Sequence, residues 1–264
     1  MADARINAGA AATAAEPAIR RIGLADLRAV LAQGWQDFLA TPTQLVFLTV
    51  LYPVLGLVAA RAAYGGDLMS LIWPLISGFA LVGPLAALGV YELSRRREQG
   101  LPTTWLNAFD VLRSPAIGGI VFLGGVLLAI FVCWLLAAQA IWDGTIGAAA
   151  PASIGDLVRL AFDTPEGRRL LWLGNGVGFL FAVLVLSLTV VAFPLLLDRA
   201  VDPAVAMRTS VRAVLANPVP MAAWGLIVAV LLLLGSLPLF IGLAVVLPVL
   251  GHATWHLYRR VVVR

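Results

Sequence analysis

Long apolar runs separated by short polar segments dominate the chain. An α-helix needs about 20 apolar residues to cross the roughly 30 Å hydrocarbon layer of a bilayer, and six segments meet or approach that length. The runs are continuous rather than alternating, which does not fit the ten-residue strands of a membrane β-barrel. The pattern therefore predicts an all-α, polytopic membrane helix bundle with about six transmembrane helices, at residues 43–63, 68–93, 116–142, 170–197, 219–235 and 237–258.

The composition supports this prediction. Of the 264 residues, 61% are hydrophobic and 12% are charged, and the mean hydropathy is +0.97. Soluble domains carry about 25% charged residues, so most of this chain must face lipid or other apolar helices. Residues 1–19 are rich in alanine and lack the apolar core of a cleavable signal peptide. We expect a disordered tail at 1–19 and a single membrane domain at 20–264.

All 18 basic residues are arginines, and most fall on one side of the expected spans. Cytoplasmic segments of membrane proteins carry an excess of basic residues. We therefore expect a bacterial inner membrane protein with both termini in the cytoplasm, and a pI near 10.0 that reflects topology rather than nucleic-acid binding. The cytoplasmic arginines would be Arg20, Arg21, Arg28, Arg95, Arg96, Arg97, Arg113, Arg199, Arg208, Arg212, Arg259, Arg260 and Arg264, and the outer ones Arg61, Arg159, Arg168 and Arg169.

A degenerate three-fold repeat runs through the cytoplasmic segments. Each repeat has an amphipathic stretch, then a capping residue and a proline, which together favour a helix start. The apolar positions of the amphipathic stretches indicate helices lying in the headgroup region. The capping pairs are Thr41-Pro42, Ser114-Pro115 and Asn217-Pro218. The apolar positions are Leu31, Trp35 and Phe38; Trp105, Phe109 and Leu112; and Met207, Val211 and Val214. Prolines 84, 194 and 248 then mark the even-numbered spans, so we expect three units, each an interfacial helix plus a two-span hairpin.

Three stretches resemble a known family. They are GPLAALGVYELSRRREQG, FPLLLDRAVDPAVAMRTSVRAVLANPVPMAAWG and LPVLGHATWHLYRR. They are similar to sequences of the domain-of-unknown-function 2189 family, and the resemblance extends over about 20–260. It implies a polytopic bacterial membrane protein and brings no established activity with it.

The two histidines are the first candidates for chemistry. His252 and His256 stand four residues apart, so they share a helix face and could bind a transition metal or haem. Counted from the repeat prolines, Glu92 and Asp198 fall at matching positions, which suggests that all four side chains converge at the cytoplasmic mouth of the bundle. The alternative is an interfacial cluster in which Trp255 and Tyr258 form an aromatic belt.

Arginines near the expected cytoplasmic surface are candidates for binding lipid headgroups. These are Arg95, Arg96, Arg97, Arg259 and Arg260. No catalytic constellation and no bound cofactor is predicted, so the first hypothesis is a non-enzymatic membrane scaffold or accessory protein. Its partners would be lipids and another membrane protein or a second copy. A small-solute transporter or channel is the alternative, and a metal- or haem-handling protein using His252 and His256 is the third hypothesis.

Overall fold

The computed structural model describes residues 16–41, 74–75, 81, 83–147, 151, 154–238 and 240–263. Within these ranges every named element is a helix, and one bridge pairs Ile19 with Val262. The all-α prediction is therefore confirmed for the described part of the chain. The helices are α1 (Leu24–Ala40), α4 (Gly83–Ala86), α5 (Leu88–Glu98), η3 (Trp105–Arg113), α6 (Ile117–Thr145), α7 (Ile154–Asp163), α8 (Pro165–Thr189), α9 (Ala192–Asp198), α10 (Pro203–Ala216), α11 (Pro218–Ser236) and α12 (Leu243–Val261).

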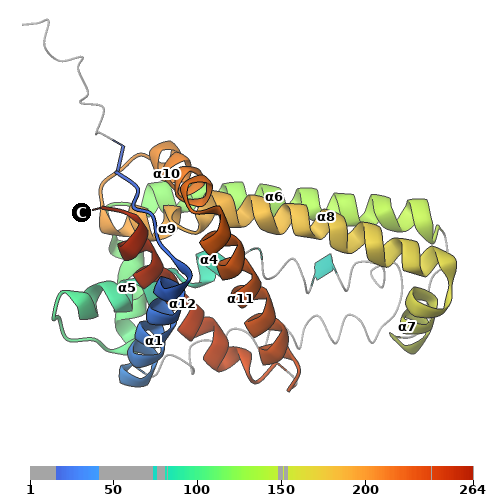
Figure 1. Ribbon diagram of the computed structural model, residues 1–264, viewed down its shortest axis with the longest axis horizontal. Coiled ribbons are helices and arrows are strands. Elements are labelled where there is room, and N and C mark those ends of the chain that lie inside the picture. The colour runs from blue at the N-terminus through green and yellow to red at the C-terminus, as the bar shows by residue number, and fades with distance from the viewer. Residues whose placement is uncertain are drawn as a thin grey trace, which may run out of the picture.

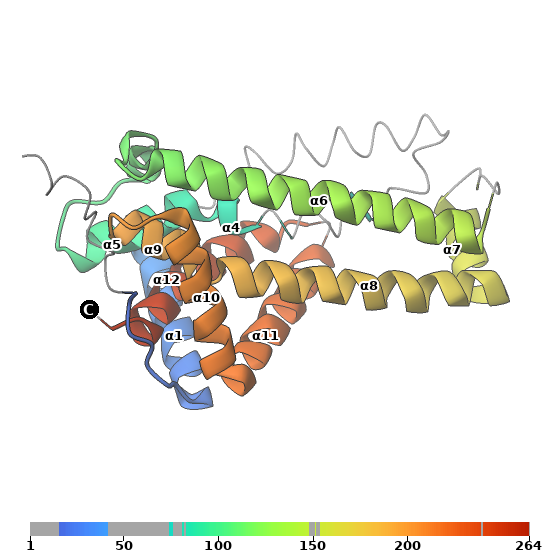
Figure 2. The ribbon, with the colours of Figure 1, turned by 90° about the horizontal axis from the view of Figure 1, so that it is seen from above.

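A long helical hairpin extends from a block of shorter helices. In both views α6 and α8 run side by side away from the block, with α7 at their far end, while α1, α5, α9, α10 and α12 gather at the other end (Figure 1 and Figure 2). The hairpin is held by Trp134 and Phe181, whose ring centroids lie 5.6 Å apart. Gly178 permits this approach, because a Cβ there would lie 3.1 Å from the Trp134 indole. The small helix α7 packs against α8 at that end of the hairpin.

Among the described residues, three helical stretches are long and apolar enough to cross a membrane. They are Ile117–Thr145, Pro165–Asp198 and Pro218–Ser236, and they match the spans expected at 116–142, 170–197 and 219–235. The expected span at 43–63 lies outside the described residues. Of the span at 68–93, residues 74–75, 81 and 83–93 are described, and α4 and α5 lie in its last part. Helix α12 is not among the three, because its second half carries two histidines and two arginines.

The stretch Pro165–Asp198 contains two helices with different surroundings. Helix α8 ends at Thr189, and the backbone N–H of Val191 then donates to Ser210 Oγ of α10 at 3.2 Å. Helix α9 follows, and its residues from Ala192 to Leu197 are all buried. Since α8 alone, at 25 residues, is about 37 Å long, the apolar side chains of α9 are needed for the protein core rather than for crossing lipid.

The expected turn between the last two helices is wrong in its length. Helix α11 ends at Ser236 and α12 begins at Leu243 instead of 237. Gly235, the last residue of the span expected at 219–235, packs against Gly242, where an added Cβ would lie 2.8 Å from the Gly235 Cα. The glycine therefore serves a close contact between the two chain segments.

The predicted helix starts are only partly correct. Asn217 is the N-cap of α11 with Pro218 at the next position, but its side chain makes no capping bond. Ser114 ends η3 rather than starting α6, whose N-cap is Ala116. Thr41 ends α1, and Pro42 lies outside the described residues. The second interfacial element also differs from expectation, because η3 is a 3₁₀ helix.

Residues 16–23 lie along the block and bring the two ends of the described chain together. Ile19 bridges Val262, and the Arg20 N–H donates to the Val261 carbonyl at 2.7 Å. Residues 16–19, which the sequence places in the tail, include Glu16, whose carboxylate accepts from Arg208 and Arg212 at 2.9 and 2.7 Å. The rest of the expected tail, 1–15, lies outside the described residues.

Candidate functional site

Two polar networks surround the second half of α12. One network faces α1 and α5, and contains His252 and His256. The other faces α5 and α9, and contains Tyr258 and Arg259. Helical periodicity explains the division, because side chains on one helix point to different neighbours as the backbone turns.

Asp37 of α1 is the centre of the first network. Its Oδ2 accepts hydrogen bonds from His256 Nε2 at 2.8 Å and from Ser94 Oγ at 2.9 Å. Its Oδ1 lies 3.0 Å from Nε of Arg97. Since these partners belong to α5 and α12, one buried carboxylate joins three helices that are distant in sequence.

The surroundings of Asp37 keep it ionised. Burial acts to raise the pKa of this carboxyl, but the hydrogen bond and charge of His256, with smaller effects of Ser94 and His252, outweigh it and lower the pKa below its ordinary value near 3.8. An ionised carboxylate only accepts hydrogen bonds. His256 Nε2 must therefore carry a proton toward Asp37.

The same reasoning assigns the protons of His252, whose ring is 1% exposed. Ser94 has one hydroxyl hydrogen, which it donates to Asp37, so the 2.7 Å contact between Ser94 Oγ and His252 Nδ1 requires an N–H on Nδ1. In the neutral ring Nε2 is then a bare lone pair. Nε2 is buried and has no hydrogen-bond partner among the residues that the structure describes, which is uncommon for a buried polar atom.

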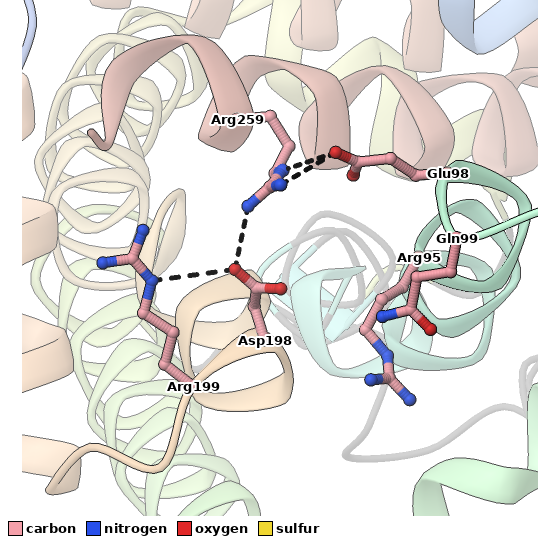
Figure 3. A pocket seen from close by; sticks show the side chains of 6 residues that line it. All are labelled: Arg95, Glu98, Gln99, Asp198, Arg199 and Arg259. Carbon is pink, nitrogen blue, oxygen red and sulfur yellow. Dashed lines mark hydrogen bonds and ion pairs between the residues drawn. The ribbon is translucent and has the colours of Figure 1, made fainter. Parts of the chain in front are cut away.

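The second network lines an open recess of about 470 Å³ at the ends of α5, α9 and α12 (Figure 3). Arg259 stands between two carboxylates, donating to Asp198 Oδ2 at 3.0 Å and to Glu98 Oε1 at 2.8 Å. Two buried rings support these acids from behind: Tyr258 Oη donates to Asp198 at 2.6 Å and Trp255 Nε1 to Glu98 at 3.1 Å. The aromatic belt expected for these two rings is wrong, because both are fully buried.

The charges around the recess balance. Arg95, also in the lining, donates through Nε and Nη2 to both oxygens of Glu92, at 2.7 and 2.9 Å. Arg199, the third cation, lies 3.7 Å from Asp198 and donates to the Val263 carbonyl at 2.7 Å. The three guanidinium groups therefore pair with three carboxylates, those of Glu98 and Asp198 in the lining and that of Glu92 outside it. Paired charges of this kind hold helices in register more than they attract a free ion.

The four residues of the metal hypothesis are distributed over three ion-pair groups. His252 and His256 both contact Asp37, at 3.8 and 2.8 Å from Oδ2. Glu92 is paired with Arg95, and Asp198 is bound by Tyr258, Arg259 and Arg199. Within the described ranges no three His, Cys, Asp or Glu side chains are grouped so as to hold a metal ion. Metal or haem binding stays a prediction.

Each of the five arginines expected to bind headgroups faces a carboxylate in this structure. These pairs are Arg95–Glu92, Arg96–Asp110, Arg97–Asp37, Arg259–Glu98 and Arg260–Asp26, with distances between 2.6 and 3.3 Å. An arginine can still offer remaining N–H groups to a phosphate. Headgroup binding by these residues therefore stays a prediction, to be weighed against a structural role for each.

Sequence reasoning missed Asp37 and Ser94 of the first network and Glu98 of the second. A signal for Asp37 was present: it stands five residues before Pro42, as Asp110 stands five before Pro115. Both aspartates pair with neighbouring arginines of α5. An aspartate five residues before each of these prolines, in a stretch expected to be amphipathic, was the local signal for such an ion pair.

The long apolar helices and the buried polar block together define an integral membrane protein. Residues 72–198 match the model of the family described as predicted integral membrane protein (DUF2189), which confirms the resemblance seen in the sequence. The match reaches from before α4 to the end of α9, and so covers the α6–α8 hairpin. No curated protein and no solved structure matches the chain.

Proposed function

We propose that this protein is a non-enzymatic scaffold or accessory protein of a bacterial inner membrane, with both termini in the cytoplasm. The observation that carries the proposal is the pairing in its polar block. The carboxylates of Asp37, Glu98 and Asp198 are each bonded to a side chain of another helix, and these bonds hold α1, α5, α9 and α12 together. The block thus has the features of a rigid platform on membrane helices.

The order of packing supports the proposal of three repeated units. Helix α5 packs against η3, and α9 against α10, and each of these pairs is consecutive in the chain. The equivalent third pair, α12 with α1, is joined by the Ile19–Val262 bridge and by the Val263 N–H, which donates to the Ala18 carbonyl at 3.0 Å. The last unit thus meets the first, an arrangement that suits two termini on one side of a membrane.

Apolar side chains on the outer faces of the spans offer surfaces to lipid or to another membrane protein. On α8, Trp172 is 83% exposed, and Phe179 and Leu180 are also exposed. On α11, Leu226 and Leu233 are exposed. Contiguous exposed apolar patches are uncommon on soluble proteins and indicate membrane or protein contacts.

The test is a quantitative pull-down of the tagged protein from its own membranes in mild detergent. A matched pair of variants locates the contact: Trp172→Ala with Phe179→Ala changes the α8 face, and Leu226→Ala with Leu233→Ala changes the α11 face. We expect a partner at stoichiometric amounts that one double variant loses and the other keeps. If no protein is enriched above an unrelated tagged membrane protein, the scaffold proposal fails.

The unpartnered Nε2 of His252 favours the metal hypothesis as a second candidate. Elemental analysis of the purified protein, beside His252→Ala, His256→Ala, Glu92→Gln and Asp198→Asn, decides it. Bound metal that is lost with His252→Ala would support a metal-handling role. Equal, background-level metal in all preparations would end that hypothesis. Transport of a small solute stays a prediction for uptake assays in reconstituted vesicles.

A further inference from the structure

The element η3 presents three different faces, because a 3₁₀ helix has three residues per turn and places residues i, i+3 and i+6 in one line. The sequence suggested an α-helical face of Trp105, Phe109 and Leu112. The observed geometry instead aligns Leu106, Phe109 and Leu112 into one apolar stripe.

The first of the three faces packs inward. Val111 is buried, and Ala108 lies so close to α5 that a Cβ on Gly89 would be 2.9 Å from the Ala108 Cβ. The second face is polar: Asn107 Nδ2 donates to Asp110 Oδ2 at 2.8 Å, and Asp110 pairs with Arg96. These two faces fix the orientation of η3 on α5.

The third face is uncovered. Leu106, Phe109 and Leu112 are 58%, 52% and 68% exposed, and Trp105 beside them is 49% exposed. The Trp105 and Phe109 rings meet edge to face, with centroids 6.5 Å apart. The matching positions of the other two helices are covered in part: Phe38 of α1 is buried and Met207 of α10 packs against the core, whereas Trp35 of α1 is 45% exposed.

The chain itself indicates what covers the stripe. Helix η3 ends at Arg113 and the candidate span α6 begins at Ile117, so at most four residue steps, roughly 14 Å of extended chain, separate them. Exposed apolar residues continue into α6 at Val121 and Phe122. A tryptophan and an exposed arginine flanking the stripe are the residues favoured at the boundary between headgroups and acyl chains.

We propose that η3 is a membrane-surface anchor whose stripe of Leu106, Phe109 and Leu112 inserts at the boundary between headgroups and acyl chains of the leaflet that α6 enters. The anchor deepens the proposed scaffold role and rests on it, because it fixes the polar block against the bilayer. The polar face of Asn107 and Asp110 then points away from the acyl chains, which gives the element a three-residue period in its exposure to lipid.

Spin labels on single cysteines test the anchor in nanodiscs of phosphatidylethanolamine and phosphatidylglycerol. The native Cys133 is exposed on α6 and serves as the lipid-facing reference. In a Cys133→Ala background, labels replace Leu106, Phe109 or Leu112 on the stripe, and Arg113 or Arg28 as exposed controls. Collisions with oxygen, which concentrates in lipid, are compared with collisions with a water-soluble nickel chelate.

We expect the three stripe positions to show an oxygen-to-nickel collision ratio several-fold above that at Arg28 and approaching that at Cys133, with a lower ratio at Arg113. Nickel access at the stripe equal to that at Arg28 would overturn the proposal. If both reagents fail to reach the labels on the stripe, the proposal is also overturned, and another protein surface covers the stripe. If the reagents reach these labels in discs that hold one copy of the protein, that surface belongs to a second copy.

The outcome is separable from the scaffold test. A water-exposed stripe beside a lipid-facing Cys133, with a partner still captured, would remove the anchor and leave the scaffold. A lipid-facing stripe without any captured partner would do the reverse. The labelled positions are exposed residues of η3 and α1, together with the exposed Cys133 of α6. Each variant is therefore expected to remain folded, and monodisperse elution of each is checked before labelling.

Discussion

Helices α1 and α12 pack closely at Gly34. A Cβ added to this glycine would lie 2.6 Å from the backbone nitrogen of Ala253 and 2.8 Å from the carbonyl oxygen of Val249. Both atoms belong to the backbone of α12, so no side-chain rotation can make room. We predict that Gly34→Ala forces α1 away from α12 and destabilises the block.

The size of the effect follows from three contributions. Overpacking a well-packed contact costs about 1–3 kcal/mol, and the better helix propensity of alanine returns at most about 1 kcal/mol. A displacement of roughly 1 Å also weakens the bonds that Asp37 makes to Ser94 and His256, which lie at 2.9 and 2.8 Å, and hydrogen bonds to a charged group contribute about 1.5–3 kcal/mol each. We expect a net loss of about 3 kcal/mol.

Thermal unfolding in mild detergent, followed by tryptophan fluorescence, measures this loss. For a chain of this size about 3 kcal/mol corresponds to a fall in Tm of roughly 6–12 °C. The matched control is Gly125→Ala in α6, where an added Cβ meets nothing within 4 Å, and its Tm should stay at or slightly above that of the wild type. Equal Tm values for the two variants would refute the reasoning from the α1–α12 contact.

Three further results are expected. Asp37→Asn should lower the free energy of unfolding by about 3 kcal/mol, because it breaks a buried ion pair. Since folding lowers the pKa of Asp37, the stability that this carboxylate contributes should persist above about pH 4 and be lost as the pH falls further, so Tm should fall with pH in the wild type and depend less on pH in the variant. Trp224→Ala, at a side chain that is 1% exposed, should lower the stability by about 3–5 kcal/mol in the same assay, whereas Trp172→Ala should change it by less than about 0.5 kcal/mol. Similar losses in the two variants would contradict the different burial of the two tryptophans. Asn217→Ala removes the hydrogen bond from the Ile22 N–H and two bonds to backbone carbonyls, and should cost about 2 kcal/mol in chemical denaturation, while Asn175→Ala loses a bond within its own helix and should be nearly neutral. An unchanged midpoint for Asn217→Ala would show that Asn217 does not hold the N-terminal segment.

The sequence predicted the hairpin better than the block. The α6 span was recognisable because its residues meet lipid along most of their length, and hydropathy reports such surroundings directly. Hydropathy could not separate α9 from α8, since a helix buried in protein and a helix buried in lipid have the same apolar composition. Likewise Trp255 and Tyr258 resemble interfacial residues in sequence, but only the neighbouring Glu98 and Asp198 explain why they are buried.

The candidate site was predicted in part. The shared face of His252 and His256 follows from their spacing, because four residues are slightly more than one helical turn. Their common partner Asp37 lies 215 residues before His252 in the sequence, and a local sequence pattern does not predict which helices pack together. The convergence expected of Glu92 and Asp198 with the histidines came from counting residues after three prolines, and such a count does not give the rotation of each helix about its axis.

By itself, the sequence determined that this chain enters a membrane, where its long helices lie and which family it resembles, because the transfer of apolar side chains from water to lipid depends on composition and length alone. The tertiary structure decided which polar groups meet, which apolar faces stay uncovered, and that η3 turns with three residues per turn and so exposes Leu106 in line with Phe109. Those choices depend on distances of a few ångströms between segments far apart in the chain, and such distances are fixed only when the helices pack together.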